Sequence, residues 1–68
     1  MSSLAELSVG DIIAGQVSGV APLGVFVRIT DDADGLIPGA SGLAVGDQVR
    51  VRILELDPAR SRAALALI

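Results

Sequence analysis

The side chains best suited to contact another molecule are one phenylalanine and five arginines, because the sequence contains no lysine, histidine, tyrosine or tryptophan. Phe26 and Arg28 alternate with two valines, so in a strand they lie on the opposite face from those valines. An exposed ring offers a flat surface for stacking, and a neighbouring guanidinium also stacks or pairs with anions. In the alternative interpretation Phe26 packs under a loop or at a subunit contact, and Arg28 pairs with Asp32 or Asp34.

Two more arginines, Arg60 and Arg62, flank a turn that begins at Asp57 and Pro58. Exposed guanidinium groups beside a turn can contact an anionic group such as a phosphate. Surface solubility is the alternative for both, and for Arg60 alone it is the simpler explanation. The remaining arginines form a second outward stripe, which solubility explains.

Catalysis and metal binding are not predicted. The sequence has no histidine and no cysteine, and its serines have no evident base beside them, so no nucleophile and base are found together. Asp31, Asp32 and Asp34 lie in one short stretch that lacks the spaced oxygen ligands of a calcium loop. We therefore expect a protein that is not an enzyme and that holds no metal or cofactor.

The composition predicts one small domain without a membrane-spanning segment. The chain has 68 residues, 51% of them hydrophobic, but no apolar run approaches the roughly 20 residues of a membrane helix. The first residues lack the features of a signal peptide, so a cytoplasmic location is expected. The narrow alphabet is explained equally by a GC-rich genome and by a simplified or engineered sequence. The net charge of −3 disfavours nucleic-acid binding by bulk attraction, so such binding requires a local basic patch.

A short sequence motif that occurs twice indicates a mostly β structure. Val-Gly-Asp at Val9 and again at Val45 is followed each time by alternating apolar residues. Glycine tolerates the positive φ of a tight turn, aspartate bonds to nearby backbone, and alternation is typical of a half-buried strand. Duplication and independent reuse of a good turn remain equally open.

The alternation predicts five strands in a barrel domain that spans residues 9–68, after a lead-in at residues 1–8 whose Leu4 and Leu7 cover one barrel end. The expected strands are residues 11–20, 25–29, 36–37, 48–56 and 62–68, with a polar turn at 31–35 and a glycine-rich connection from Pro38 to Asp47. The alternation breaks at Leu54, which predicts a bulge there. The residues expected to face inward are Ile13, Val17, Val25, Val27, Ile29, Val49, Val51, Ile53, Leu65 and Leu67. A flat sheet of this composition would leave one apolar face in water, so we expect a small closed barrel.

In this order the motifs resemble the S1 RNA-binding domain family, over most of the chain from Val9 to Leu67. The residues that carry the resemblance are Gly15-Gln16-Val17, Gly24-Val25-Phe26-Val27, Gly35-Leu36-Ile37-Pro38, Val45-Gly46-Asp47-Gln48-Val49, Leu54-Glu55-Leu56-Asp57 and Arg62. The resemblance implies a five-stranded OB-fold barrel that binds single-stranded RNA, weakly and with little sequence preference. The implied binding surface is the face of the second and third strands with the turn between the fourth and fifth. Its residues are Phe26, Arg28, Arg62, Arg60, Leu23, Pro38 and Asp57.

This sequence departs from the family pattern at several of these positions. Leu23 stands where an aromatic residue is common, and Pro38 stands where many members have histidine. Ala64 and Ala66 replace serines that are common in the last strand. The helix that usually links strands three and four is shortened or absent, which removes a cap from one barrel end.

Two other functions remain open at this point. In the first, the chain is a scaffold barrel that has lost its RNA-binding face and that self-associates through exposed apolar surface. In the second, the barrel binds an oxyanion between subunits through backbone N–H groups and Ser41, which the order of the motifs supports poorly.

Overall fold

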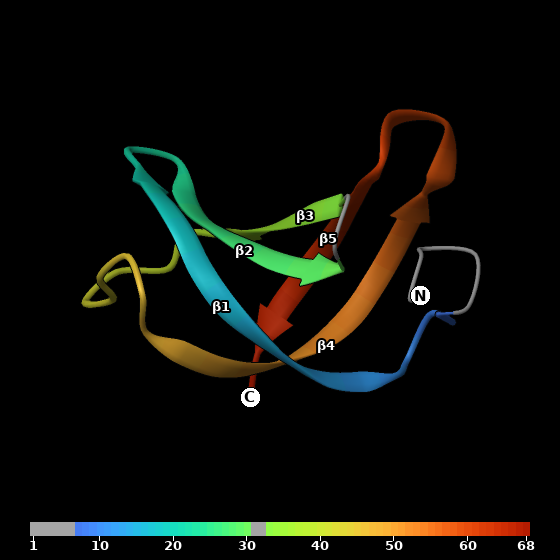
Figure 1. The fold of residues 1–68 in the computed structure, drawn as a ribbon, viewed down its shortest axis with the longest axis horizontal. Coiled ribbons are helices and arrows are strands. Elements are labelled where there is room, and N and C mark those ends of the chain that lie inside the picture. Colours follow the sequence, from blue (N-terminus) through green and yellow to red (C-terminus); the bar gives the residue numbers. More distant parts are fainter. Residues whose placement is uncertain (1–6, 31–32) are drawn as a thin grey trace.

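The computed structural model describes residues 7–30 and 33–68, which form a closed barrel of five strands (Figure 1). The strands are β1 (Ile12–Ala21), β2 (Gly24–Thr30), β3 (Ala33–Pro38), β4 (Gln48–Asp57) and β5 (Arg62–Leu67). They pair in the order β1-β2-β3-β5-β4, and β4 pairs with β1 to close the cylinder. The pairing of β3 with β5 is parallel and the other four are antiparallel. The predicted closed five-stranded barrel is confirmed.

The core lies inside this cylinder and consists of small and branched aliphatic side chains. Most residues predicted to face inward are buried, and Ile13, Ile29 and Val49 are half-buried against them. Leu67 is on the inward face as predicted, since it is the ladder partner of the buried Val51, but it is 47% exposed because β5 ends there at the barrel rim. The buried core residues are Val17, Val25, Val27, Ala33, Ile37, Val51, Ile53, Ala63 and Leu65.

The third strand is longer than the sequence predicted. Ala33 and Gly35 belong to β3 and are buried, so the expected polar turn at 31–35 is wrong for residues 33–35, whereas Asp31 and Asp32 lie outside the described residues. The reason is tertiary pairing. β3 has β2 on one side and β5 on the other, and two ladders stabilise a strand that contains the poor strand formers aspartate and glycine.

The bulge predicted near Leu54 is confirmed. The register of β4 against β5 shifts between Ile53 and Glu55, so that Leu54 is 47% exposed while Ile53 is fully buried. The extra residue also restores the inward phase for Leu56, which packs against the core.

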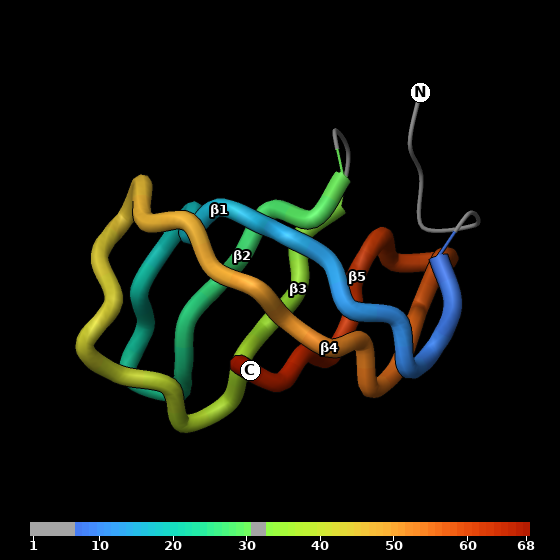
Figure 2. Tube along the Cα trace, turned by 90° about the horizontal axis from the view of Figure 1, so that it is seen from below, coloured from blue at the N-terminus to red at the C-terminus, as the bar shows by residue number. Residues whose placement is uncertain are grey.

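The two ends of the barrel are closed by different connections (Figures 1 and 2). The β1–β2 turn and the loop of residues 39–47 lie at one end, and the β4–β5 turn with the short 3-10 helix η2 (Pro58–Arg60) lies at the other. The loop contains no helix, as predicted, but its Ala40 and Leu43 pack against the core and cover part of that end. Leu7 packs against the core as well, whereas Leu4 lies outside the described residues. Within the described ranges, no helix has the length and apolar character needed to cross a membrane.

The two Val-Gly-Asp phrases form the same turn. A carboxylate oxygen of Asp11 accepts a hydrogen bond from the backbone N–H of Ser8 at 3.0 Å, and Asp47 accepts one from Ala44 at the same distance. The preceding glycines have nearly equal positive φ, 95° and 98°. Both copies therefore use glycine for the left-handed backbone and aspartate to bond the turn.

Candidate nucleic-acid interface

Three outward side chains lie next to one another across β2, β3 and β5. Phe26 is the cross-strand partner of Leu36, and Leu36 is the partner of Ala64. Phe26 is 42% exposed, as the alternation of β2 predicted. Together these side chains form an apolar surface with one aromatic ring at its edge.

This surface is the floor of a groove of about 430 Å³. Asp34 and Arg62, which are partners in the β3–β5 ladder, stand at one end of the floor, and Pro38 stands at the other. We call this feature the Phe26 groove. It is lined by Phe26, Asp34, Leu36, Pro38, Arg62 and Ala64, together with Gly35 and Ala63.

Two arginines lie on either side of Asp34. Arg28 is its partner on β2, and the Arg28 Nε lies 3.9 Å from the Asp34 Oδ1. The alternative interpretation that Arg28 pairs with Asp34 is therefore confirmed. Both side chains are about half exposed or more, so the pair is screened by water and contributes little to stability. Breaking this ion pair, so that the guanidinium can bind an anion, therefore costs little free energy.

The turn between β4 and β5 places Asp57 and Arg60 apart from the groove floor. The Arg60 Nε lies 3.7 Å from the Asp57 Oδ2, and the Arg60 side chain is 77% exposed. Asp57 is also the ladder partner of Arg62, so it stands beside the groove arginine on the β4 side. Arg60 is not among the residues that line the groove.

The structure therefore brings together only part of the predicted set. Phe26, Pro38 and Arg62 line the groove, and Arg28 borders it through Asp34. Leu23 is 81% exposed in the β1–β2 turn, and it does not line the groove. Its backbone carbonyl accepts a hydrogen bond from Gly39 at 3.0 Å, which ties this turn to the loop after β3.

Five residues that line the groove were missed by the sequence reasoning: Asp34, Gly35, Leu36, Ala63 and Ala64. Asp34 was assigned to a turn because β3 was predicted two residues long. With β3 extended, Asp34, Leu36 and Pro38 share one face by simple alternation. That alternation is a usable signal, but the local sequence Asp-Gly hides it.

Nothing in the described part of the chain points to a metal centre. No group of three or more histidine, cysteine, aspartate or glutamate side chains is close enough there to hold an ion. The chemistry that the groove offers is apolar and aromatic contact together with hydrogen bonds from guanidinium groups.

Comparison with known proteins gives a consistent result. The family profile described as S1 RNA binding domain matches residues 6–68. The chain is 40% identical over 76 residues to the transcriptional accessory protein Tex of Neisseria gonorrhoeae, covering 94% of this chain and 10% of that protein. It is 30% identical over 71 residues to the small ribosomal subunit protein bS1 of Mycobacterium tuberculosis, covering 88% of this chain and 15% of that protein. Among solved structures, GSP13 from Bacillus subtilis superposes with a TM-score of 0.81 at 26% identity, covering 91% of this chain and 56% of that one.

Proposed function

The chain belongs to the S1 RNA-binding domain family, and on that premise we propose that it binds single-stranded RNA in the Phe26 groove. Binding is weak and tolerant of sequence, and it also involves the turn between β4 and β5. The chain spans a small fraction of the length of the curated relatives it matches, 10% of Tex and 15% of bS1. We therefore propose a binding module rather than an enzyme, and we transfer no activity of a whole relative to it.

The observation that carries the proposal is the exposed ring of Phe26 in a groove that also contains Arg62. Stacking on an aromatic ring accepts any base, because every base has a π-face. Arg62 supplies a donor for phosphate, which fixes position without reading sequence. The floor provided by Leu36 and Ala64 has no polar side-chain atoms, so the groove offers few groups that discriminate among bases.

The weakness of binding follows from what stands near the guanidinium groups. Asp34 lies between Arg28 and Arg62 on β3, and Asp57 lies on the far side of Arg62. These carboxylates repel phosphate, and the position held by Pro38 provides no hydrogen-bond donor. The groove contains a single aromatic ring.

Titration with oligouridylate and oligoadenylate at low salt tests the proposal, with backbone amide shifts recorded by NMR. We expect shifts at Phe26, Leu36 and Arg62, and we expect Phe26→Ala to raise Kd about fivefold or more, since one stacked base contributes roughly 1–3 kcal/mol. Leu54→Ala is the matched control, because Leu54 is similarly exposed (47% against 42% for Phe26) on the β4 bulge outside the groove. Absence of shifts in the groove at millimolar RNA would remove the proposal.

The scaffold alternative keeps one supporting observation. Large hydrophobic side chains are exposed at the barrel end formed by the β1–β2 turn and the loop of residues 39–47: Val20, Leu23 and Val45. Apolar surface of this kind favours self-association. If the chain is a scaffold, Phe26→Ala alters thermal stability or the mass measured by light scattering. RNA then produces no response in the unmodified protein or in the variant. The same samples therefore separate the two functions.

A further inference from the structure

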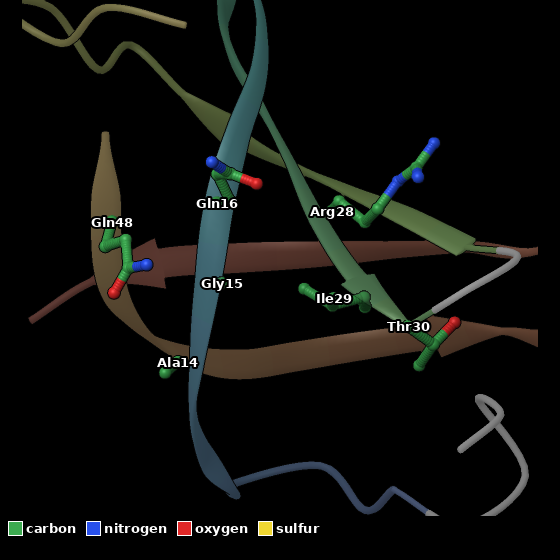
Figure 3. Close-up of a pocket in the computed structure, with 7 residues that line it drawn as sticks. All are labelled: Ala14, Gly15, Gln16, Arg28, Ile29, Thr30 and Gln48. Carbon is green, nitrogen blue, oxygen red and sulfur yellow. The ribbon is translucent and has the colours of Figure 1, made fainter. Parts of the chain in front are cut away.

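A second hollow, on the other side of Arg28, extends the binding surface beyond the Phe26 groove. It has a volume of about 330 Å³ and lies between β1 and β2, with the first residue of β4 at its border (Figure 3). Its polar side chains are those of Gln16, Arg28, Thr30 and Gln48. We call it the β1–β2 hollow. Its volume is at the lower end of the range of small-ligand sites.

The hollow exists because β1 and β2 separate at this point. The β1–β2 ladder runs from Ala21 and Gly24 to Gln16 and Arg28 and ends there. Beyond that pair β1 continues along β4 alone, while β2 continues toward Thr30 beside β3 (Figure 1). Diverging strands leave a gap that ladder hydrogen bonds do not close, and such a gap offers polar backbone to a ligand.

The side chains around this gap match the hydrogen-bonding edges of a nucleobase. The side-chain amide of Gln16 donates to the backbone carbonyl of Gly46 at 3.3 Å, which holds this side chain at the border. Gln48 is the cross-strand partner of Gln16, so the two side chains start from neighbouring backbone positions on β4 and β1 (Figure 3). An amide presents a donor and an acceptor together, which is the pattern of base edges in single-stranded RNA. None of the described residues that line the hollow carries a carboxylate, in contrast to the Phe26 groove with its Asp34.

The hollow and the groove are connected by one continuous row of polar side chains. Neighbouring strands are about 4.8 Å apart, so successive members of the row are close neighbours. Arg28 lies between Gln16 on β1 and Asp34 on β3, and it therefore borders both features. We call these side chains the polar row; in order of pairing they are Gln48, Gln16, Arg28, Asp34, Arg62 and Asp57.

We propose that the β1–β2 hollow is a second nucleotide subsite, in which Gln16 and Gln48 bond to a base and Arg28 contacts the adjoining phosphate. This inference rests on the proposed function, because the RNA strand enters the hollow from the Phe26 groove. It places Arg28 at the phosphate that joins the nucleotide in the groove to the nucleotide in the hollow. A dinucleotide occupies the groove alone, and a longer strand occupies both.

The test uses an unusual property of the sequence, which has two glutamines and no asparagine. The side-chain carboxamide NH₂ signals in a ¹⁵N correlation spectrum therefore come from Gln16 and Gln48 only. We expect an adenine dinucleotide to shift groove amides without moving these signals. An oligoadenylate of about eight nucleotides, within the range bound by a single OB-fold, shifts both sets.

Two variants make the test quantitative. Gln48→Ala is expected to weaken binding of the longer oligomer about three- to tenfold, the size of one lost hydrogen bond, and to leave dinucleotide binding unchanged. Gln48→Glu places a carboxylate in the hollow and is expected to weaken the longer oligomer further. Ser8→Ala, at an exposed polar residue outside both features, is the control for which both affinities stay the same.

The outcomes separate the two proposals. If the groove signals respond while the glutamine NH₂ signals stay fixed and Gln48→Ala binds the longer oligomer normally, the second subsite is wrong and the proposed function stands. If no signal responds to either oligomer, both proposals fail together.

Discussion

Gly35 on β3 lies directly against the side chain of Leu65, a core residue of β5. A Cβ built at Gly35 would overlap the Leu65 Cδ1, lie 2.6 Å from the Leu65 Cγ, and lie 3.2 Å from the carbonyl oxygen of Ala63. Leu65 is fully buried, so its side chain has no free volume into which to move. The Gly-Leu-Ile motif therefore has a packing reason, and its Leu36 is on the opposite face, in the groove.

Gly35→Ala is expected to lower the free energy of unfolding by about 1–3 kcal/mol, the usual cost of overpacking a core. Gly19→Ala is the matched control, since its added Cβ would make only ordinary contacts of 3.8 and 3.9 Å with Phe26. Urea denaturation of both variants provides the measurement. Equal stability of the two proteins would show that Leu65 does not limit the space at Gly35.

At this scale the sequence predicted which way most side chains face. The outward position of Phe26 and the buried positions of Val25 and Val27 follow from alternation alone. The neighbours of Phe26 across the ladder do not follow, because Leu36 and Ala64 are 28 positions apart and meet only through the parallel β3–β5 pair. The register between strands decides which side chains share a groove. The alternation within one strand does not say which residues of another strand lie opposite.

Among the elements, the repeated turn connects β1 and β4 reciprocally. The backbone N–H of Gly10 donates to the carbonyl of Ile53 at 2.7 Å, and that of Gly46 donates to the carbonyl of Val17 at 2.9 Å. Each turn thus bonds to the strand that follows the other turn. The β1–β4 pairing is centred on Ala14 and its partner on β4, so the repeat is also a local two-fold relation in space.

Asp11→Ala and Asp47→Ala should each lower the free energy of unfolding by about 1 kcal/mol, because each removes one hydrogen bond to a backbone N–H. The two turns lie at opposite ends of the β1–β4 pair, so the losses should add in the double variant. Chemical denaturation of the two single variants and the double variant checks both statements. A double variant no less stable than the less stable single variant contradicts the additivity of the two losses.

The elements differ in how far local sequence determined them. The bulge at Leu54 was predictable, since the phase of the apolar residues changes there and only an extra residue keeps both Ile53 and Leu56 inward. The extent of β3 was not, because its first half contains Asp34 and Gly35, which are poor strand formers. Its stability comes from two neighbouring strands that are distant in sequence.

For the whole molecule, closure of the barrel determines how charge is distributed around it. The polar row passes across all five strands and returns to β4, so its two arginines are flanked by carboxylates and amides rather than by other cations. The net charge of −3 repels RNA at long range. Among the arginines, Arg28 lines the hollow and Arg62 lines the groove, so attraction within these two features depends on direct contact with these two side chains.

This distribution predicts a shallow dependence of RNA affinity on salt. For single-stranded nucleic acid, each neutralised phosphate contributes about −0.7 to the slope of log K against log salt concentration. Two arginines that each contact one phosphate therefore give a slope of about −1.4. The long-range repulsion is itself screened, with a Debye length of about 10 Å at 0.1 M salt, which flattens the dependence further. Fluorescence anisotropy of a labelled oligoadenylate across a salt series measures the slope.

Variants at two arginines test whether this salt dependence comes from a phosphate contact at Arg28. Arg28→Gln should bring the slope for the longer oligomer closer to zero by about 0.7, because one phosphate contact is lost. Arg52→Gln changes the net charge by the same amount, but Arg52 pairs with Ile12 and Ala66 and lines neither the groove nor the hollow, so its slope should match that of the unmodified protein. Equal slopes for the two variants would mean that RNA responds to the net charge of the barrel, and the placement of phosphate at Arg28 would then be wrong.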